Sequence, residues 1–161
     1  SLLAVGTTAV FRNHPRRAGG YFTLARVPVP MDDADLVERA RTARENAYAP
    51  YSEYTVGAAL VTADGTVYTG CNIENANYSN SLHAEEVAVG KAVSAGHSDF
   101  QKLVVTSGER DAVTPCGMCR QTLAEFCDDD VPVLCDDGEG FERYTVGELI
   151  PDTISPATLG K

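Results

Sequence analysis

Apolar residues recur at three- and four-residue intervals in three segments of the chain, and this spacing predicts three helices. The first predicted helix spans residues 34–47, because Asp32 or Asp33 can cap its start and Pro50 ends the pattern. Its apolar positions are Leu36, Val37, Ala40, Ala43 and Ala47. We therefore expect this helix to bury one face against the rest of the protein.

The same spacing predicts a second helix over residues 83–95 and a third over residues 116–127. Gly96 supplies a C-terminal stop for the second helix. A short segment, residues 146–150, follows the last predicted strand.

Runs rich in β-branched and aromatic residues predict five strands, over residues 54–61, 66–70, 102–106, 131–135 and 141–145. Asp64-Gly65 has the turn chemistry of a hairpin between the first two. Strands then alternate with helices in the second half of the chain, which implies crossovers over a central sheet. The predicted fold class is α/β, a three-layer α/β/α sandwich with a mixed five-stranded sheet.

Residues 1–30 differ from the rest of the chain, because they hold four arginines, no acidic residue, and several prolines and glycines without a helical or strand period. We interpret them as an N-terminal extension, with translated sequence upstream of a start at Met31 as the favoured hypothesis and an organelle address as the alternative. The single expected domain covers residues 31–161.

The chain is acidic, with 13 Lys and Arg against 23 Asp and Glu and a formal charge of −10. Such a charge disfavours nucleic-acid partners, which require phosphate-neutralising surfaces. It suggests adaptation to high salt, where repulsion between carboxylates is screened. No run of 18 apolar residues occurs, so no membrane partner is expected, and five cysteines indicate a reducing, cytoplasmic location.

Two motifs carry metal chemistry: His83-Ala84-Glu85 and Pro115-Cys116-Gly117-Met118-Cys119, each at the start of a predicted helix. Cys116 and Cys119 are one helical turn apart and can share an ion, with His83 as third ligand. Three protein ligands leave one position of a zinc ion open for water, which is typical of a catalytic site. Glu85 is suited to proton transfer at that position, and together the motifs form the signature of zinc nucleobase deaminases.

From about Met31 to Ile150 the sequence resembles the small homotetrameric cytidine deaminases. The matching segments are Tyr48-Ala-Pro-Tyr-Ser52, Val56-Gly-Ala-Ala-Leu60, Gly70-Cys-Asn-Ile-Glu-Asn-Ala76, Tyr78-Ser79, His83-Ala-Glu85 and Pro115-Cys-Gly-Met-Cys-Arg-Gln121. The resemblance implies a homotetramer in which neighbouring subunits help to close each pocket. It also implies hydrolytic deamination of cytidine and deoxycytidine to the uridines, with ammonia released, as in pyrimidine salvage.

The resemblance further implies a role for each motif residue. One zinc per chain would be held by His83, Cys116 and Cys119, and zinc-activated hydroxide would attack C4 of the pyrimidine. Glu85 would shuttle protons to N3 and then to the departing amino group.

Four residues are implied in binding the small-molecule nucleoside. Asn72 and Glu74 would bind a ribose hydroxyl, the backbone carbonyl of Ala84 would meet the amino group, and Tyr54 would lie against the base where relatives have Phe. From the residues alone, Asn72 and Glu74 also suit a turn after a strand, and Tyr54 also suits the core of a hairpin.

The sequence departs from the family pattern at two positions, because most tetrameric relatives have Cys in place of His83 and Arg in place of Glu86. Zinc with one imidazole and two thiolates is neutral, whereas zinc with three thiolates carries −1 and benefits from a nearby guanidinium. We therefore expect the two changes to compensate each other. The remaining cysteines, Cys71, Cys127 and Cys135, are predicted to be structural.

Three other functions are weighed against cytidine deamination. A deaminase of bases in RNA or DNA shares the zinc motifs, but residues 31–161 carry nine basic residues against 23 acidic ones. A deaminase of a nucleoside antibiotic such as blasticidin also shares them. A non-catalytic zinc domain is the third, although a purely structural site has no use for Glu85 and ordinarily has a fourth protein ligand.

Overall fold

The computed structural model of the chain describes residues 31–160, so the extension expected at residues 1–30 lies outside the described range. The helices and strands are α1 (Asp33–Arg44), β1 (Val56–Thr62), β2 (Val67–Cys71), α2 (Ala84–Ser94), β3 (Phe100–Ser107), α3 (Gly117–Phe126), β4 (Pro132–Asp136), β5 (Phe141–Thr145) and α4 (Val146–Leu149). Two 3-10 turns, Tyr78–Asn80 and Pro156–Leu159, were not predicted.

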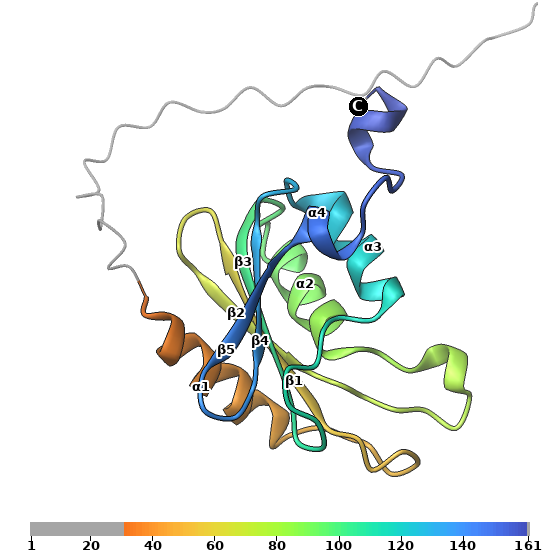
Figure 1. The fold of residues 1–161 in the computed structure, drawn as a ribbon. Coiled ribbons are helices and arrows are strands. Elements are labelled where there is room, and N and C mark those ends of the chain that lie inside the picture. Colours follow the sequence, from red (N-terminus) through yellow and green to blue (C-terminus); the bar gives the residue numbers. More distant parts are fainter. Residues whose placement is uncertain (1–30, 161) are drawn as a thin grey trace, which may run out of the picture.

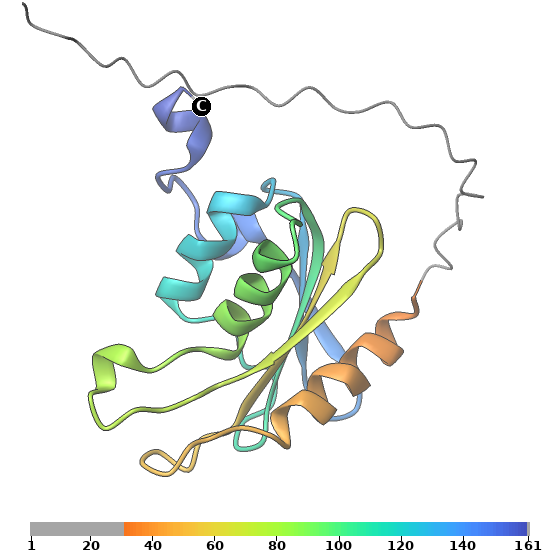
Figure 2. The same ribbon diagram turned by 180° about the vertical axis from the view of Figure 1, so that it is seen from behind.

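The five strands form one mixed sheet in the order β2-β1-β3-β4-β5. β3 and β4 are parallel, and the other neighbouring pairs are antiparallel. α1 covers one face of the sheet, and α2, α3 and α4 lie on the other (Figures 1 and 2). The predicted three-layer α/β/α sandwich is confirmed.

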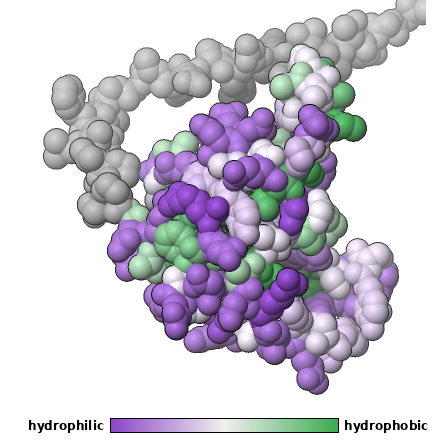
Figure 3. All heavy atoms as spheres, viewed as in Figure 1, coloured by the Kyte–Doolittle hydropathy of each residue, from purple (hydrophilic) through white to green (hydrophobic). Residues whose placement is uncertain are grey.

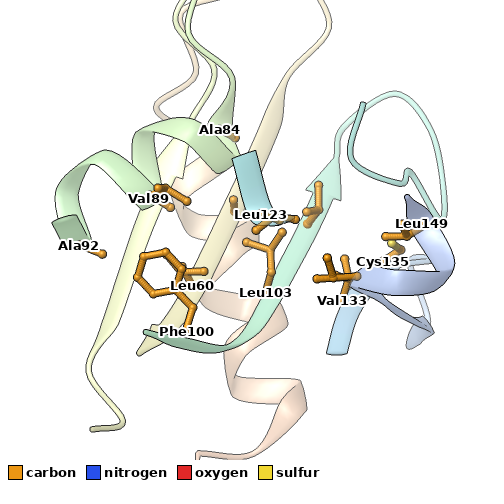
Figure 4. Packing of buried hydrophobic residues seen from close by; sticks show 14 residues of the cluster. Leu60, Ala84, Val89, Ala92, Phe100, Leu103, Leu123, Val133, Cys135 and Leu149 are labelled. Atoms are coloured by element: carbon orange, nitrogen blue, oxygen red, sulfur yellow. The ribbon is translucent and has the colours of Figure 1, made fainter. Parts of the chain in front are cut away.

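Successive side chains along a strand point to opposite faces of the sheet, and this alternation divides the core into two clusters. Ala59 and Val61 of β1 pack toward α1, together with Val104 and Leu134 from the neighbouring strands. Ala58 and Leu60 belong to the larger cluster beneath α2 and α3, much of which is shown in Figure 4. The central strands β1, β3 and β4 are therefore buried on both sides, which explains their largely apolar sequences.

Close backbone approach determines how α1 sits on the sheet. A Cβ atom on Gly57 would lie 2.1 Å from the carbonyl oxygen of Ala40. Only glycine allows the helix backbone to come this near to β1.

The predicted hairpin between β1 and β2 is present. Gly65 adopts a φ of 83°, and the Asp64 carboxylate accepts hydrogen bonds from the Thr62 hydroxyl at 2.6 Å and the Thr66 amide at 3.0 Å. These bonds, the one from Thr62 first, lower the pKa of Asp64 to about 2.

The first helix ends at Arg44, three residues before the predicted end at residue 47. The Ala47 amide still donates to the Arg44 carbonyl, but the next residue, Tyr48, donates its amide to Asn72 and pairs with Ile73 in an isolated bridge. This long-range pairing draws the chain out of the helix before Pro50 is reached.

Polar residues cover most of the face shown in Figure 3, and the apolar areas on it are small. Within residues 31–160, no helix is both long and apolar enough to cross a membrane.

Candidate metal centre

The ends of two helices bring together three metal-binding side chains. His83 is the N-cap residue of α2, Cys116 is the N-cap residue of α3, and Cys119 lies in the first turn of α3. His83 Nδ1 is 3.2 Å from Cys116 Sγ and 3.3 Å from Cys119 Sγ. All three donor atoms lie within 4.8 Å of one another, as the sequence motifs predict.

The spacing and chemistry of these donors fit zinc. Tetrahedral zinc with Zn–N of about 2.0 Å and Zn–S of about 2.3 Å requires nitrogen–sulfur separations of roughly 3.5 Å. The observed separations are within a few tenths of an ångström of this value. One imidazole and two thiolates supply three ligands, so one tetrahedral position is left for a non-protein ligand.

The thiolate form of Cys119, which is the form that binds a metal, depends on a nearby cation. Burial raises the pKa of the Cys119 thiol, and the neighbouring Glu85 carboxylate and Cys116 raise it further. A thiolate is therefore disfavoured at this position unless positive charge compensates it. A divalent ion at the three donors supplies that charge and holds the thiol deprotonated.

Glu85 lies beside the three donors in the first turn of α2 and is only 5% exposed. Burial raises its pKa above the ordinary value for glutamate. A buried carboxyl group at this position can exchange a proton with a molecule bound next to it. The proton-transfer role of Glu85 stays a prediction.

A cavity of about 400 Å³ adjoins the cluster. Its walls contain His83, Cys116 and Glu85, so two of the three donors face it. The four residues predicted to bind substrate also line it, namely Tyr54, Asn72, Glu74 and Ala84. A larger hollow of about 730 Å³ between the end of α3 and the C-terminal segment contains none of these residues.

Asn72 joins the end of β2 to the start of β1. Its Nδ2 donates to the Tyr54 carbonyl at 2.8 Å, and its Oδ1 accepts from the Val56 amide at 2.8 Å. Asn72 directly follows β2 and lies outside any turn, and its side chain connects the two strands. The second Nδ2 hydrogen is left for another acceptor at the cavity.

Glu74 is held by the loop that precedes β1. Its carboxylate accepts hydrogen bonds from the Ser52 hydroxyl, the Tyr51 amide at 2.8 Å and the Ser52 amide at 3.2 Å. These bonds, above all the one from the Ser52 hydroxyl, lower the pKa of Glu74. The cavity therefore contains a fixed anionic acceptor, and Ser52 is a contributor that the sequence prediction missed.

Ala84 is fully buried, and its carbonyl oxygen is the nearest heavy atom to a Cβ built on Gly70, at 2.2 Å. Tyr54 is half-buried at the cavity wall, just before β1 begins. Their predicted contacts with the amino group and the base stay predictions.

The other three cysteines are apart from the cluster. Burial raises the pKa of both Cys127 and Cys135 to about 12, so both are neutral thiols at physiological pH. The Cys71 thiol contacts the Asn46 carbonyl at 3.4 Å. Within the described part of the chain, His83, Cys116 and Cys119 form the only group able to share an ion, which supports one zinc per chain.

Comparisons with known proteins identify one family. A family model described as "Cytidine and deoxycytidylate deaminase zinc-binding region" matches residues 30–135. The chain is 46% identical over 130 residues to a cytidine deaminase of Sporosarcina psychrophila, covering 80% of this chain and 96% of the relative. It is 44% identical over 126 residues to a cytidine deaminase of Halalkalibacterium halodurans, covering 78% of this chain and 96% of the relative.

A crystal structure of cytidine deaminase from Burkholderia pseudomallei superimposes with a TM-score of 0.73 at 39% identity. The match covers 77% of this chain and all of the Burkholderia chain. Both the fold and the zinc-binding region are therefore shared with proteins of this kind.

Proposed function

Because this chain belongs to the cytidine and deoxycytidylate deaminase family, we propose that its cavity binds cytidine or deoxycytidine and hydrolyses the C4–amino bond. Water is consumed, ammonia leaves, and the products are uridine or deoxyuridine. The observation that carries the proposal is the position of Glu85, a buried acid beside three metal-binding atoms at the wall of the cavity.

His83, Cys116 and Cys119 would hold the zinc ion, which supplies a Lewis acid that lowers the pKa of water at its open position to roughly 7. Glu85 takes the proton released from that water as C4 is attacked. It would deliver this proton to N3. It would then take the proton of the hydroxyl now bound to C4 and pass it to the amino group, so that the 4-oxo group forms and ammonia leaves. The protons balance over the whole reaction, because Glu85 ends in the same protonation state in which it began.

The rest of the cavity orients the nucleoside. Glu74 is an anionic acceptor already fixed by the protein, so it accepts a hydrogen bond from a sugar hydroxyl without reorganisation. Asn72 offers its remaining N–H to the same sugar. Tyr54 lies against the base, and the Ala84 carbonyl lies near the amino group.

Charge favours a free nucleoside over the other deaminase substrates. The residues that line the cavity include no Lys or Arg, and they include the Glu74 carboxylate. A 5′-phosphate or a polynucleotide backbone would therefore enter without a cationic partner. We propose turnover of cytidine and deoxycytidine, with deoxycytidylate and single-stranded oligonucleotides as poor substrates. The charge of the cavity does not argue against blasticidin, which is compared with them directly.

The test is ammonia release by the purified zinc-loaded protein from each of these compounds, followed together with the ultraviolet change of the base. Cytidine should be consumed, and removal of zinc with a chelator should abolish the reaction until zinc is restored. Preferred turnover of an oligonucleotide or of blasticidin would assign a different substrate. No turnover of any compound at full zinc content would favour a non-catalytic zinc domain.

We propose a homotetramer as the assembled state. Large apolar side chains are exposed on the loops around the cavity, where the rings of Tyr51 and Tyr78 contact each other in a tilted arrangement with centroids 5.8 Å apart. Tyr48, Ile73 and Leu82 are exposed on the same loops. Other subunits would cover this surface, and light scattering of the eluting protein would measure the mass directly.

The amino-acid composition supports a proposal about the cellular location of the protein and the salt concentration there. All five cysteines are free thiols, which suits a reducing cytoplasm and a role in pyrimidine salvage. The formal charge of −10 suits an acidic proteome at high salt, and a melting temperature that rises with KCl concentration would support this. The division into an extension at residues 1–30 and a domain at residues 31–161 remains a prediction, and comparison of the full chain with a form starting at Met31 tests it.

A further inference from the structure

Arg120 is the residue after Cys119 on α3, and three of its nitrogens make separate hydrogen bonds. Nε donates to the Pro115 carbonyl at 2.6 Å, and Nη2 donates to the Thr114 hydroxyl at 2.9 Å. Nη1 donates to the Leu149 carbonyl at the end of α4 at 2.8 Å. Among residues 31–160, no carboxylate lies within ion-pair distance of Arg120. Its guanidinium therefore binds only neutral acceptors, two backbone carbonyls and one hydroxyl.

The segment that Arg120 holds leads directly into Cys116. The Ala112 amide donates to Asp136 at 2.7 Å, and the Cys116 carbonyl accepts from the Arg120 amide at 2.9 Å. Between these two points the described chain makes no other backbone–backbone hydrogen bond. The side chain of Arg120 supplies the remaining hydrogen bonds to the segment, at Thr114 and Pro115.

We propose that Arg120 is a positioning residue for the metal centre, which fixes the Thr114–Pro115 segment so that the Cys116 sulfur is held 3.2 Å from His83 Nδ1. The inference rests on the proposed zinc site and extends it to a residue that does not touch the ion. Mutation of a group that orients a metal ligand commonly lowers metal affinity by about 10- to 100-fold.

The geometry of the guanidinium is essential to this role. Its planar fork directs donors to three acceptors on two separate segments at once, whereas a lysine presents one compact ammonium group. Arg120→Lys therefore keeps the charge and loses the fixed directions. Charge alone does not restore the position of Cys116.

Gln121 provides a matched control because it is the next residue on α3 and also anchors a distant segment. Its Nε2 donates to the Ile154 carbonyl at 2.8 Å, and its Oε1 accepts from the Thr153 hydroxyl at 2.7 Å. Gln121→Ala therefore loosens the C-terminal segment and leaves Thr114 and Pro115 in place.

The experiment measures zinc affinity by competition with a chromogenic chelator, in the absence of substrate, for the full chain and for Arg120→Lys and Gln121→Ala. Arg120→Lys should bind zinc roughly 10- to 100-fold more weakly. The visible spectrum of its cobalt(II) form, which reports ligand geometry, should also change. Gln121→Ala should match the unsubstituted protein in both measurements.

Unchanged affinity and spectrum in Arg120→Lys would overturn the inference, as would an equal loss in Gln121→Ala. If Arg120→Lys does not fold, Thr114→Val decides, because it removes one acceptor without changing side-chain shape. Weaker zinc binding in Thr114→Val supports the inference, and unchanged binding overturns it. Failure of the unsubstituted protein to bind zinc would instead contradict the proposed function itself.

Discussion

Gly70 of β2 lies directly beneath Ala84 of α2, so that a Cβ atom on Gly70 would be 2.2 Å from the Ala84 carbonyl oxygen. The same atom would be 2.7 Å from the Ala88 amide nitrogen. Both neighbours are helix backbone, which cannot rotate away as a side chain can. The first turn of α2, which follows His83 and contains Glu85, can occupy its observed place only if residue 70 lacks a side chain.

Gly70→Ala should therefore move α2 away from the sheet and lower the free energy of unfolding by about 1–3 kcal/mol. Zinc affinity should fall with it, because His83 moves with the helix. Gly90→Ala is the control, since Gly90 lies on the exposed face of the same helix with nothing near its Cβ position. That change should raise stability by about 0.5–1 kcal/mol. Urea unfolding of both variants measures the difference, and equal effects would contradict the close-contact account.

An ion pair between the partly exposed Arg41 and the buried Asp136 makes the fold sensitive to acid. Arg41 of α1 donates from two nitrogens to Asp136 at the end of β4, at 2.6 and 2.8 Å. Burial alone would raise the pKa of Asp136, but hydrogen bonds from Arg41, Thr106 and the Gly138 amide outweigh it and lower the pKa to about 2.

Because this pKa is lower in the folded protein than the ordinary value of 3.8, the folded state binds fewer protons than the unfolded state between these values. The stabilisation is present above pH 4 and is lost as the pH falls toward 2. Its size is about 2 kcal/mol. Asp136→Asn should flatten the dependence of unfolding free energy on pH in this range, and an unchanged slope would contradict the assignment.

Substitutions of Tyr54 test whether the base lies against this wall of the cavity. Tyr54→Phe keeps the ring and should leave kcat/KM for cytidine close to that of the unsubstituted enzyme. Tyr54→Ala removes the surface against which the base lies and should lower kcat/KM by about 10- to 100-fold, the range expected for base–aromatic stacking. Zinc content should stay the same in both. Normal kcat/KM in Tyr54→Ala would place the base elsewhere in the cavity.

Periodicity in the sequence was sufficient to predict the sandwich, because each strand and helix buries residues at its own local spacing. The zinc donors could also be predicted, since a helix start places Cys116 and Cys119 on one turn and the motif supplies His83. Contacts between segments that are distant in the sequence could not be predicted in this way. The pairing of Tyr48 with Ile73 shortens α1, and no local pattern encodes it.

The same reason explains the site residues that the prediction missed. Ser52 and Arg120 both lie inside the segments that resemble the family, but their partners are far away in the sequence or depend on loop conformation. Asn72 shows the converse, because a residue assigned to substrate also fastens two strands. Such double roles become visible only when hydrogen-bond partners are known.

The charge of the metal centre gives a test of the two departures from the family pattern. Glu86 lies in the first turn of α2 beside Glu85, and the Thr122 hydroxyl contacts it at 3.4 Å. His83→Cys would change a neutral zinc site to one of charge −1 next to this carboxylate. Zinc affinity should fall in His83→Cys and recover in the double variant His83→Cys/Glu86→Arg. Full affinity in the single variant, measured by chelator competition, would refute the compensation.

Glu85→Gln tests the central claim most directly, because it keeps the size of the side chain and removes its ability to carry a proton. The purified variant should hold one zinc per chain, while ammonia release from cytidine falls by roughly 10²- to 10⁴-fold. Glu125→Gln, which changes an exposed acid on α3, should leave turnover unchanged. Turnover of cytidine by zinc-loaded Glu85→Gln at the rate of the unsubstituted protein would contradict the account.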